Sequence, residues 1–259
     1  MPKFTSNDAE INYQTFGDAN NPAIVFSNSL GTKYSMWQVQ IEHFQKDHFV
    51  ICYDTRGHGQ SSAPQGPYTI DQLGQDVVNL LDHLNIQKAD FCGISMGGVT
   101  GQWLAIHHSA RFNHVIVCNT AAKIGQEQAW LDRAKLVREQ GLKPIAETAA
   151  LRWFTERFIQ SQSTIVESMS NDLAAGSAEG YASCCEALAK ADLREDLKSI
   201  SVPVLVIAGQ QDPVTTVADG QFMVDRIANA ELFEIDASHI SNVEKPQEFN
   251  QALEKFLAR

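Results

Sequence analysis

The chain has 259 residues and a mass of 28.6 kDa, with 44% hydrophobic and 20% charged residues, which is enough apolar sequence for a sizeable core and excludes a disordered or fibrous protein. The net charge of -11, from 31 acidic and 20 basic residues, argues against binding to nucleic acid or to an anionic membrane, because phosphate groups must be met by cations.

We expect neither an export signal nor a membrane anchor. Residues 1–10 lack the apolar stretch of a signal peptide, and the longest apolar run, residues 202–208, is far too short to span a bilayer.

Adjacent Cys184 and Cys185 have no second pair at metal-ligand spacing, so we expect no metal site. The other cysteines lie in apolar, strand-like runs, as reduced thiols of a cytoplasmic protein do: Cys52, Cys92 and Cys118.

Short apolar runs alternate with amphipathic helical segments along most of the chain. The predicted strands are 23–27, 49–53, 89–94, 115–119, 202–208 and 232–235. The predicted helices are 70–84, 99–107, 218–227 and 247–257. Such alternation is typical of parallel strands joined by crossover helices. We therefore predict an α/β fold with a mostly parallel sheet and flanking helices.

One interval, residues 122–196, breaks this alternation. It contains no strand-like run, only a helical pattern interrupted by glycine and proline. A helical insertion between two strands of a parallel sheet lies over the carboxyl edge, where the sites of α/β proteins form. We therefore predict a core of residues 1–121 and 197–259, with residues 122–196 as a helical cap, or lid.

The string GISMG at residues 93–97 is a G-x-S-x-G motif between a predicted strand and a predicted helix. The turn from strand to helix is sharp, so the residues two positions before and after Ser95 must be small. A serine at such a turn is a candidate nucleophile. The alternative is a helix N-cap serine whose neighbouring glycines allow close packing.

A nucleophilic serine needs a base, and the base must be oriented by a carboxylate. With a nucleophile of this kind, the order along the chain is serine, acid, histidine, each just beyond a strand. Asp212 and His239 follow the last two predicted strands. Asp236 is a rival acid, but it precedes His239 by only three residues on the same loop. We therefore predict the triad Ser95, Asp212 and His239.

The oxyanion of an acyl-transfer intermediate needs two backbone N–H donors, one after the nucleophile and one from the loop after an earlier strand. Met96 supplies the first. The string SNSLG at residues 27–31 is the second loop, and there we select Leu30. An ordinary glycine turn is the alternative for this loop.

These features resemble the α/β-hydrolase superfamily along nearly the whole chain. The string DTRGHGQS at residues 54–61 is similar to a loop of that superfamily, and we interpret Arg56 and His58 as structural and not catalytic. Residues 28–31 depart from the His-Gly pair that is usual at the oxyanion loop. Serine at position 95, where some branches carry aspartate, points to acyl transfer to water, with esters, lactones or C–C bonds beside a carbonyl as substrates.

A closer resemblance narrows the reaction. The strings SNSLGT, GISMGGVTGQWLAIH, CNTAAKIG, LRWFTERF and SHISNVEKP, spread between residues 27 and 246, resemble the 3-oxoadipate enol-lactonase family. The resemblance implies hydrolysis of 3-oxoadipate enol-lactone, a small anionic lactone, to 3-oxoadipate in the β-ketoadipate pathway, through an acyl-enzyme on Ser95. It implies neither a metal nor an organic cofactor.

That substrate carries a free carboxylate, so its site needs a cation beside an apolar wall. Residues 122–157 hold seven Lys or Arg against five Asp or Glu. On a helix that begins near residue 127, Trp130 lies on an apolar face and Arg133 at its margin. We select Arg133 as the carboxylate clamp and Trp130 as the wall, and the resemblance points to the same two residues. A solvated rim is the alternative for Arg133, and Arg138 and Arg152 are weaker candidates.

Two rival functions stay open. One is another serine hydrolase of the same fold, either a general carboxylesterase or a C–C bond hydrolase. The other is a noncatalytic ligand receptor, which does not need a complete triad. Three cap aromatics are expected to pack the lid and not to contact a ligand: Trp153, Phe154 and Phe158.

Overall fold

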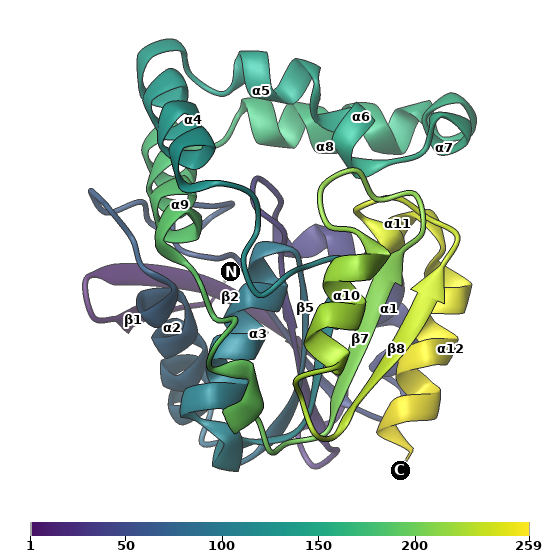
Figure 1. Cartoon of the computed structure of the whole chain (residues 1–259). Helices are drawn as coiled ribbons and strands as arrows, with labels where there is room; N and C mark the ends of the chain where they lie inside the picture. The colour runs from purple at the N-terminus through teal and green to yellow at the C-terminus, as the bar shows by residue number, and fades with distance from the viewer. Residues whose placement is uncertain (1, 259) are drawn as a thin grey trace.

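A twisted sheet of eight strands runs through residues 2–258, the part of the chain that this computed structural model describes (Figure 1). The strands are β1 (Lys3–Ser6), β2 (Ala9–Phe16), β3 (Ala23–Ser27), β4 (Phe49–Tyr53), β5 (Ala89–Ile94), β6 (Phe112–Cys118), β7 (Val204–Gly209) and β8 (Ala230–Ile235). Their order is β1-β2-β4-β3-β5-β6-β7-β8. The β1–β2 and β2–β4 pairs are antiparallel, and the other pairs are parallel. The predicted α/β fold with a mostly parallel sheet is confirmed.

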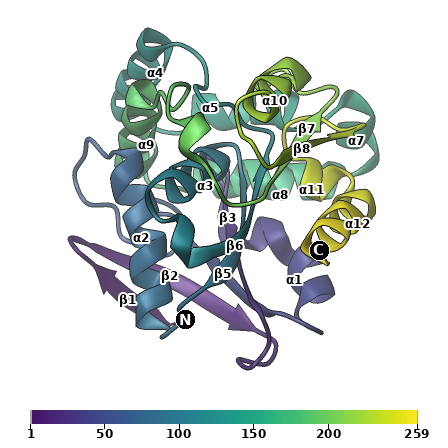
Figure 2. The ribbon, with the colours of Figure 1, turned by 60° about the horizontal axis from the view of Figure 1, so that its bottom comes forward.

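Helices cover both faces of this sheet (Figure 1, Figure 2). One face carries α2 (Ile70–His83), α3 (Met96–His107) and α10 (Val217–Val224), and the other carries α1 (Gln38–Phe44) and α12 (Pro246–Leu257). The short helix α11 (Ser241–Glu244) precedes α12. Every residue of the central strands β3 and β5 is buried, which explains why their sequences are apolar runs without alternation.

The six predicted strands are all present, but the N-terminal hairpin of β1 and β2 and helix α1 were not predicted. β3, β4 and β5 have the predicted bounds, and the ends of β6, β7 and β8 differ by up to three residues. β1 lies at the edge of the sheet, and its residues alternate between exposed and buried. Such a strand is half polar and gives no apolar run.

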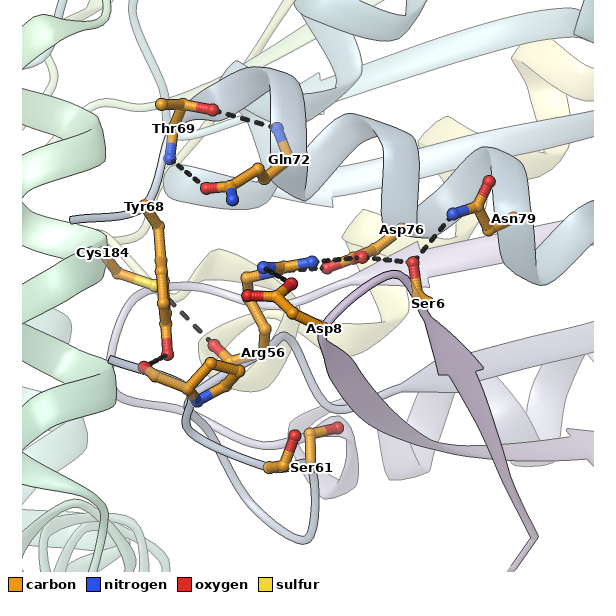
Figure 3. Close-up of polar contacts among 12 residues, drawn as sticks. Ser6, Asp8, Arg56, Ser61, Tyr68, Thr69, Gln72, Asp76, Asn79 and Cys184 are labelled. Carbon is orange, nitrogen blue, oxygen red and sulfur yellow. Dashed lines mark hydrogen bonds and ion pairs between the residues drawn. The ribbon is translucent and has the colours of Figure 1, made fainter. Parts of the chain in front are cut away.

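Helix α2 begins with a capping box, visible in Figure 3. The Thr69 hydroxyl accepts from Gln72 N–H, and the Gln72 side chain accepts from Thr69 N–H. One turn later Asp76 points into the core and binds Arg56 from the loop after β4, with distances of 2.7 Å and 2.8 Å (Figure 3). Arg56 is fully buried and also binds Asp8 at 3.1 Å. These contacts agree with the interpretation of Arg56 as structural.

Between β6 and β7 the described chain leaves the sheet and forms only helices. They are α4 (Glu127–Gln140), α5 (Lys143–Glu147), α6 (Ala149–Trp153), α7 (Glu156–Ser161), α8 (Ser163–Ala174) and α9 (Ala178–Lys190), followed by a short 3-10 turn. Helices α4 to α8 lie over one end of the sheet, and α9 packs along α4 and leads back to the core (Figure 1). Leu193 N–H donates to Ala122 O at 2.9 Å, so the two ends of this segment meet. We call residues 122–196 the cap.

Candidate active site

Ser95 lies on the sharp turn between β5 and α3. Its backbone has φ 57° and ψ -114°, a region that residues other than glycine rarely adopt. A Cβ on Gly93 would lie 2.1 Å from the Gly97 carbonyl oxygen, and a Cβ on Gly97 would lie 2.4 Å from the Ser27 carbonyl oxygen. Both glycines of the motif are therefore required by close backbone packing, and the turn lies at the carboxyl end of β5.

Ser95, His239 and Asp212 form a continuous chain of hydrogen bonds. Ser95 Oγ lies 2.8 Å from His239 Nε2, and His239 Nδ1 lies 2.8 Å from Asp212 Oδ2. The three residues follow β5, β8 and β7, so parallel strands bring them to one edge of the sheet, and all three are buried. Because Nδ1–H donates to the carboxylate, Nε2 can accept the serine proton, which is the geometry needed for acyl transfer.

The Asp212 carboxylate is held by its own loop. Oδ1 accepts from Val214 N–H at 2.7 Å and Thr215 N–H at 3.1 Å, and Oδ2 accepts from the Thr215 hydroxyl at 2.8 Å. Burial alone would raise the pKa of Asp212, but its interaction with His239 and these backbone donors outweighs burial, so the pKa lies below its ordinary value. Asp212 is therefore ionised and fixed in orientation beside His239.

Asn119 is a site residue that the sequence did not reveal. Its amide Nδ2 donates to Asp212 Oδ2 and to Ser238 O, each at 3.1 Å, while its Oδ1 accepts from the Ser241 hydroxyl at 2.6 Å. Asn119 directly follows β6 and has φ 44°. Its position at a strand end was the available signal, but no local motif accompanies it. Asn119 thus joins the acid loop to the histidine loop.

Asp236, the rival acid, lies apart from this chain of hydrogen bonds. It accepts from Gln211 Nε2 at 2.5 Å, and its carboxylate lies 3.6 Å from Arg157 and 4.0 Å from Lys245. Half of its side chain is exposed, at 52%. Asp212, and not Asp236, is the carboxylate that contacts His239.

The backbone N–H groups of Leu30 and Met96 are the predicted oxyanion donors. Leu30 lines the same cavity as Ser95, and Met96 begins α3 directly after Ser95. Among residues 2–258, no protein group accepts a hydrogen bond from either N–H. Two N–H donors near Ser95 that make no hydrogen bond to the protein fit the need of an oxyanion for two hydrogen-bond donors.

The loop after β3 is held from two sides. Gly97 N–H donates to Asn28 O at 3.1 Å, and Gly31 N–H donates to His58 Nε2 at 2.9 Å. His58 is therefore neutral, with its proton on Nδ1, which lies 3.3 Å from a backbone carbonyl. Burial lowers the pKa of His58 and favours this neutral form. His58 supports the loop that carries the first proposed donor, in agreement with a structural role.

A cavity of about 280 Å³ lies between the triad and the cap. Trp130 and Arg133, the predicted wall and clamp, both line it, and so does Arg152. Trp153 was expected only to pack the cap. It is buried, but it also faces the cavity, so that expectation was incomplete. The lining residues are Ser29, Leu30, Ser95, Ile124, Gly125, Gln126, Ala129, Trp130, Arg133, Arg152, Trp153, Leu173, Tyr181, Pro213, Val214 and His239.

Two guanidinium groups reach this cavity without a carboxylate partner. The Arg133 guanidinium lies over the Trp130 ring, 4.9 Å from its centroid. Arg152 donates to the backbone carbonyls of Thr148 at 3.2 Å and Ile145 at 3.1 Å. No carboxylate within residues 2–258 forms an ion pair with either group. Both arginines are partly exposed, and two cations without a carboxylate partner at one cavity favour an anionic ligand.

The protonation states preserve this positive charge. Burial lowers the pKa of Arg152, and the charge of Arg133 lowers it further, but a guanidinium stays protonated in proteins. Burial raises the pKa of Tyr181, which lines the same cavity, to about 12. Its phenol is therefore neutral at physiological pH, and the two arginines keep their combined charge.

The other basic residues of the first half of the cap are mostly neutralised. Arg138, a weaker clamp candidate, binds Glu179 at 2.9 Å and Glu186 at 2.6 Å, and Lys123 binds Asp192 at 3.1 Å. The excess of two positive charges over residues 122–157 is thus no uniform patch.

Of the three aromatic residues expected to pack, Phe154 stacks on Phe158 with centroids 4.8 Å apart: these two do pack the cap.

No group of three or more His, Cys, Asp or Glu side chains within residues 2–258 is arranged to hold a metal ion. In the same part of the chain, none of the helices has the length and apolar character needed to cross a membrane.

The chain is similar to known proteins over nearly its full length. A family model described as the alpha/beta hydrolase fold matches residues 22–246. The chain is 68% identical to 3-oxoadipate enol-lactonase 2 of Acinetobacter baylyi over 255 residues, 98% of this chain and 96% of that protein. It is 48% identical to 3-oxoadipate enol-lactonase 1 of the same organism over 247 residues, 95% and 92% of the two chains.

Solved structures give the same result. The crystal structure of the enol-lactonase from Burkholderia xenovorans matches with a TM-score of 0.98 and 44% identity, and the match covers 100% of both chains. The chain therefore belongs to the α/β hydrolase fold family, in the branch that contains the 3-oxoadipate enol-lactonases.

Proposed function

We propose that this protein is a serine hydrolase that opens the ring of 3-oxoadipate enol-lactone to give 3-oxoadipate, in the β-ketoadipate pathway of aromatic catabolism. Ser95 is the nucleophile, His239 the general base and acid, and Asp212 the group that orients His239. The N–H groups of Leu30 and Met96 stabilise the oxyanion. The hydrogen-bonded chain from Ser95 Oγ through His239 to Asp212 supports these roles.

The observation that carries the substrate assignment is the pair of unpaired guanidinium groups in the cavity above Ser95. The lactone is a small ring with one free carboxylate. Arg133 would bind that carboxylate, with Arg152 adding positive charge and Trp130 forming an apolar wall. The names of the two Acinetobacter relatives support the same substrate.

In the first half of the reaction, His239 Nε2 takes the proton of Ser95, and Ser95 Oγ attacks the lactone carbonyl carbon. The oxyanion that forms receives hydrogen bonds from the two backbone donors. Collapse of the tetrahedral intermediate breaks the ring C–O bond and leaves an acyl-enzyme. The leaving group is an enol oxygen, a better leaving group than an alkoxide; it takes the proton held by His239, which leaves His239 neutral, and the enol then becomes the ketone.

In the second half, water loses a proton to His239 and attacks the acyl carbon. The second tetrahedral intermediate collapses, Ser95 Oγ leaves and regains its proton from His239, and the product departs with two carboxylates.

We propose that residues 122–196 act as a lid that keeps this cavity apart from bulk water. We also propose a cytoplasmic location, which the five free, buried cysteines support.

The decisive experiment compares turnover of the enol-lactone with that of neutral aryl esters and neutral lactones. We expect a higher kcat/KM for the enol-lactone. The Arg133→Ala variant should lose roughly 2 to 4 kcal/mol of transition-state stabilisation with the enol-lactone and little with a neutral aryl ester. Lys135→Ala, an exposed cation on the same helix, is the control and should match the wild type.

Higher kcat/KM values for the esters would favour a general carboxylesterase. Equal losses on both substrates in Arg133→Ala would contradict the clamp. A noncatalytic receptor is tested by labelling with a fluorophosphonate. Labelling of the wild type that disappears in Ser95→Ala supports an enzyme, and a wild type that stays unlabelled supports the receptor.

A further inference from the structure

We propose that Glu244 is a positioning residue that couples the cap to His239. It lies in α11, five residues after the histidine and outside the triad. The inference rests on the proposed role of His239 as general base, but it does not depend on the identity of the substrate. It assigns a role to a residue of the SHISNVEKP string that the triad leaves unexplained.

Glu244 holds the residue just before His239. Its Oε2 accepts from Ser238 N–H at 3.0 Å. Asn119 Nδ2 donates to the Ser238 carbonyl oxygen from the other side, at 3.1 Å. The peptide groups on both sides of Ser238 are therefore fixed by buried side chains, and their position determines where the Cα of His239 lies.

The same carboxylate reaches across to the cap. Glu244 Oε1 accepts from the Thr155 hydroxyl, and Oε2 accepts from Thr155 N–H at 3.3 Å. Thr155 caps the first turn of α7, and the end of the cap that carries α6 and α7 lies over α11 (Figure 1). One carboxylate thus joins the histidine loop to the cap.

A second link lies on the other side of His239. Ile240 N–H donates to the Trp153 carbonyl oxygen at 2.9 Å, so the residues before and after His239 are both tied to the segment 153–155. The side chain of Trp153 lines the cavity. A substrate that contacts Trp153 therefore contacts the same backbone segment, residues 153–155, that is hydrogen-bonded to the residues on either side of His239.

The surroundings of Glu244 fit a positioning role and do not fit a role in an ion pair. The residue is buried, at 8% exposure, and no Lys or Arg within residues 2–258 forms an ion pair with it. Its hydrogen bonds come from the two backbone N–H groups and one hydroxyl described above. Leaving such donors unpaired in a buried site is costly, so removal of the carboxylate should shift the histidine loop.

The test measures kcat and KM for a neutral aryl ester, with kcat normalised to active sites titrated by a fluorophosphonate. We expect Glu244→Ala to lower kcat per site about 10-fold to 100-fold, because a small displacement of a catalytic group has effects of that size, with KM within about 2-fold. Glu244→Gln should stay within about 3-fold of the wild type, since an amide oxygen can accept from the two N–H groups and its NH₂ can donate to the Thr155 hydroxyl oxygen. Glu248→Ala, an exposed glutamate on α12, is the control.

A Glu244→Ala protein with kcat per site within about 2-fold of the wild type would overturn the proposal, since a merely structural carboxylate changes only the folded fraction. If Glu244→Ala gives no active sites that the fluorophosphonate can titrate, the variants Thr155→Val and Thr155→Ser are measured instead. Valine should lower kcat per site about 3-fold to 10-fold, and serine should restore it. No loss in Thr155→Val would overturn the coupling. The neutral ester needs no arginine clamp, so this experiment can still be interpreted if the lactone assignment fails. Labelling that persists in Ser95→Ala would instead refute the triad.

Discussion

The amide of Asn119 donates to the carboxylate of Asp212 at 3.1 Å, although the two residues are 93 positions apart and the whole cap lies between them in the sequence. This bond spans the ends of β6 and β7, neighbouring strands of the sheet. It adds a fixed donor to an oxygen that also accepts from His239. Asn119 therefore helps to hold the orientation of the carboxylate that contacts His239.

We predict that Asn119→Gly lowers kcat for a neutral ester about 10-fold, because the carboxylate loses a positioning donor. Glycine is the useful replacement, since it allows the positive φ at this position. Asn85→Gly is a matched control, because Asn85 also has a positive φ, at 57°, and does not line the cavity. Steady-state kinetics would contradict the role of Asn119 if the two variants had the same kcat.

Gly97→Ala should destabilise the fold and abolish activity together. The added Cβ would lie 2.4 Å from the backbone oxygen of Ser27, which cannot move aside as a side chain can, so we expect a loss of about 2 to 4 kcal/mol in the free energy of unfolding. Gly220→Ala in α10 is the control, because its nearest neighbour is a leucine methyl group at 3.0 Å and alanine favours a helix. Urea denaturation measures both, and equal stability of the two variants would refute the packing argument.

Arg152→Met should raise KM for the enol-lactone about 10-fold and leave neutral ester hydrolysis nearly unchanged, because the methionine keeps apolar volume but removes one of the two unpaired cations. In the double variant with Arg133→Ala, the two losses should not be additive if both arginines act on one carboxylate. Kinetics of the four proteins of this cycle give the coupling energy. Strict additivity would mean that the two guanidinium groups act independently.

The stability of the protein should depend on His58 below neutral pH. Burial holds the pKa of folded His58 below its ordinary value of 6.5, so the unfolded chain binds this proton first. The stabilisation is fully present above pH 6.5 and is lost as the pH falls from there toward the folded pKa. In His58→Gln, the free energy of unfolding should fall less steeply between about pH 6.5 and 5 than in the wild type.

Urea titrations over that pH range test this expectation. Parallel pH profiles for wild type and His58→Gln would show that His58 does not contribute to the acid sensitivity of the fold.

How far the fold could be predicted depended on burial. β3 and β5 lie in the middle of the sheet and are buried on both faces, so they appear in the sequence as unbroken apolar runs. β1 lies at the edge, and its residues alternate between exposed and buried. Its four residues give too short and too polar a pattern to recognise without the partner strand β2.

The sequence by itself determined the α/β class and pointed to the three residues of the proposed triad, because each of these residues directly follows a strand and Ser95 carries a local glycine motif that backbone packing requires. Arg152 was only a weaker candidate, and the structure brings it to the cavity beside Arg133. Asn119 and Glu244 could be found only in the tertiary structure. Their function lies in contacts with residues of other elements, Asp212 and Thr155, and such contacts depend on how separate elements pack and leave no periodic or local pattern in the chain.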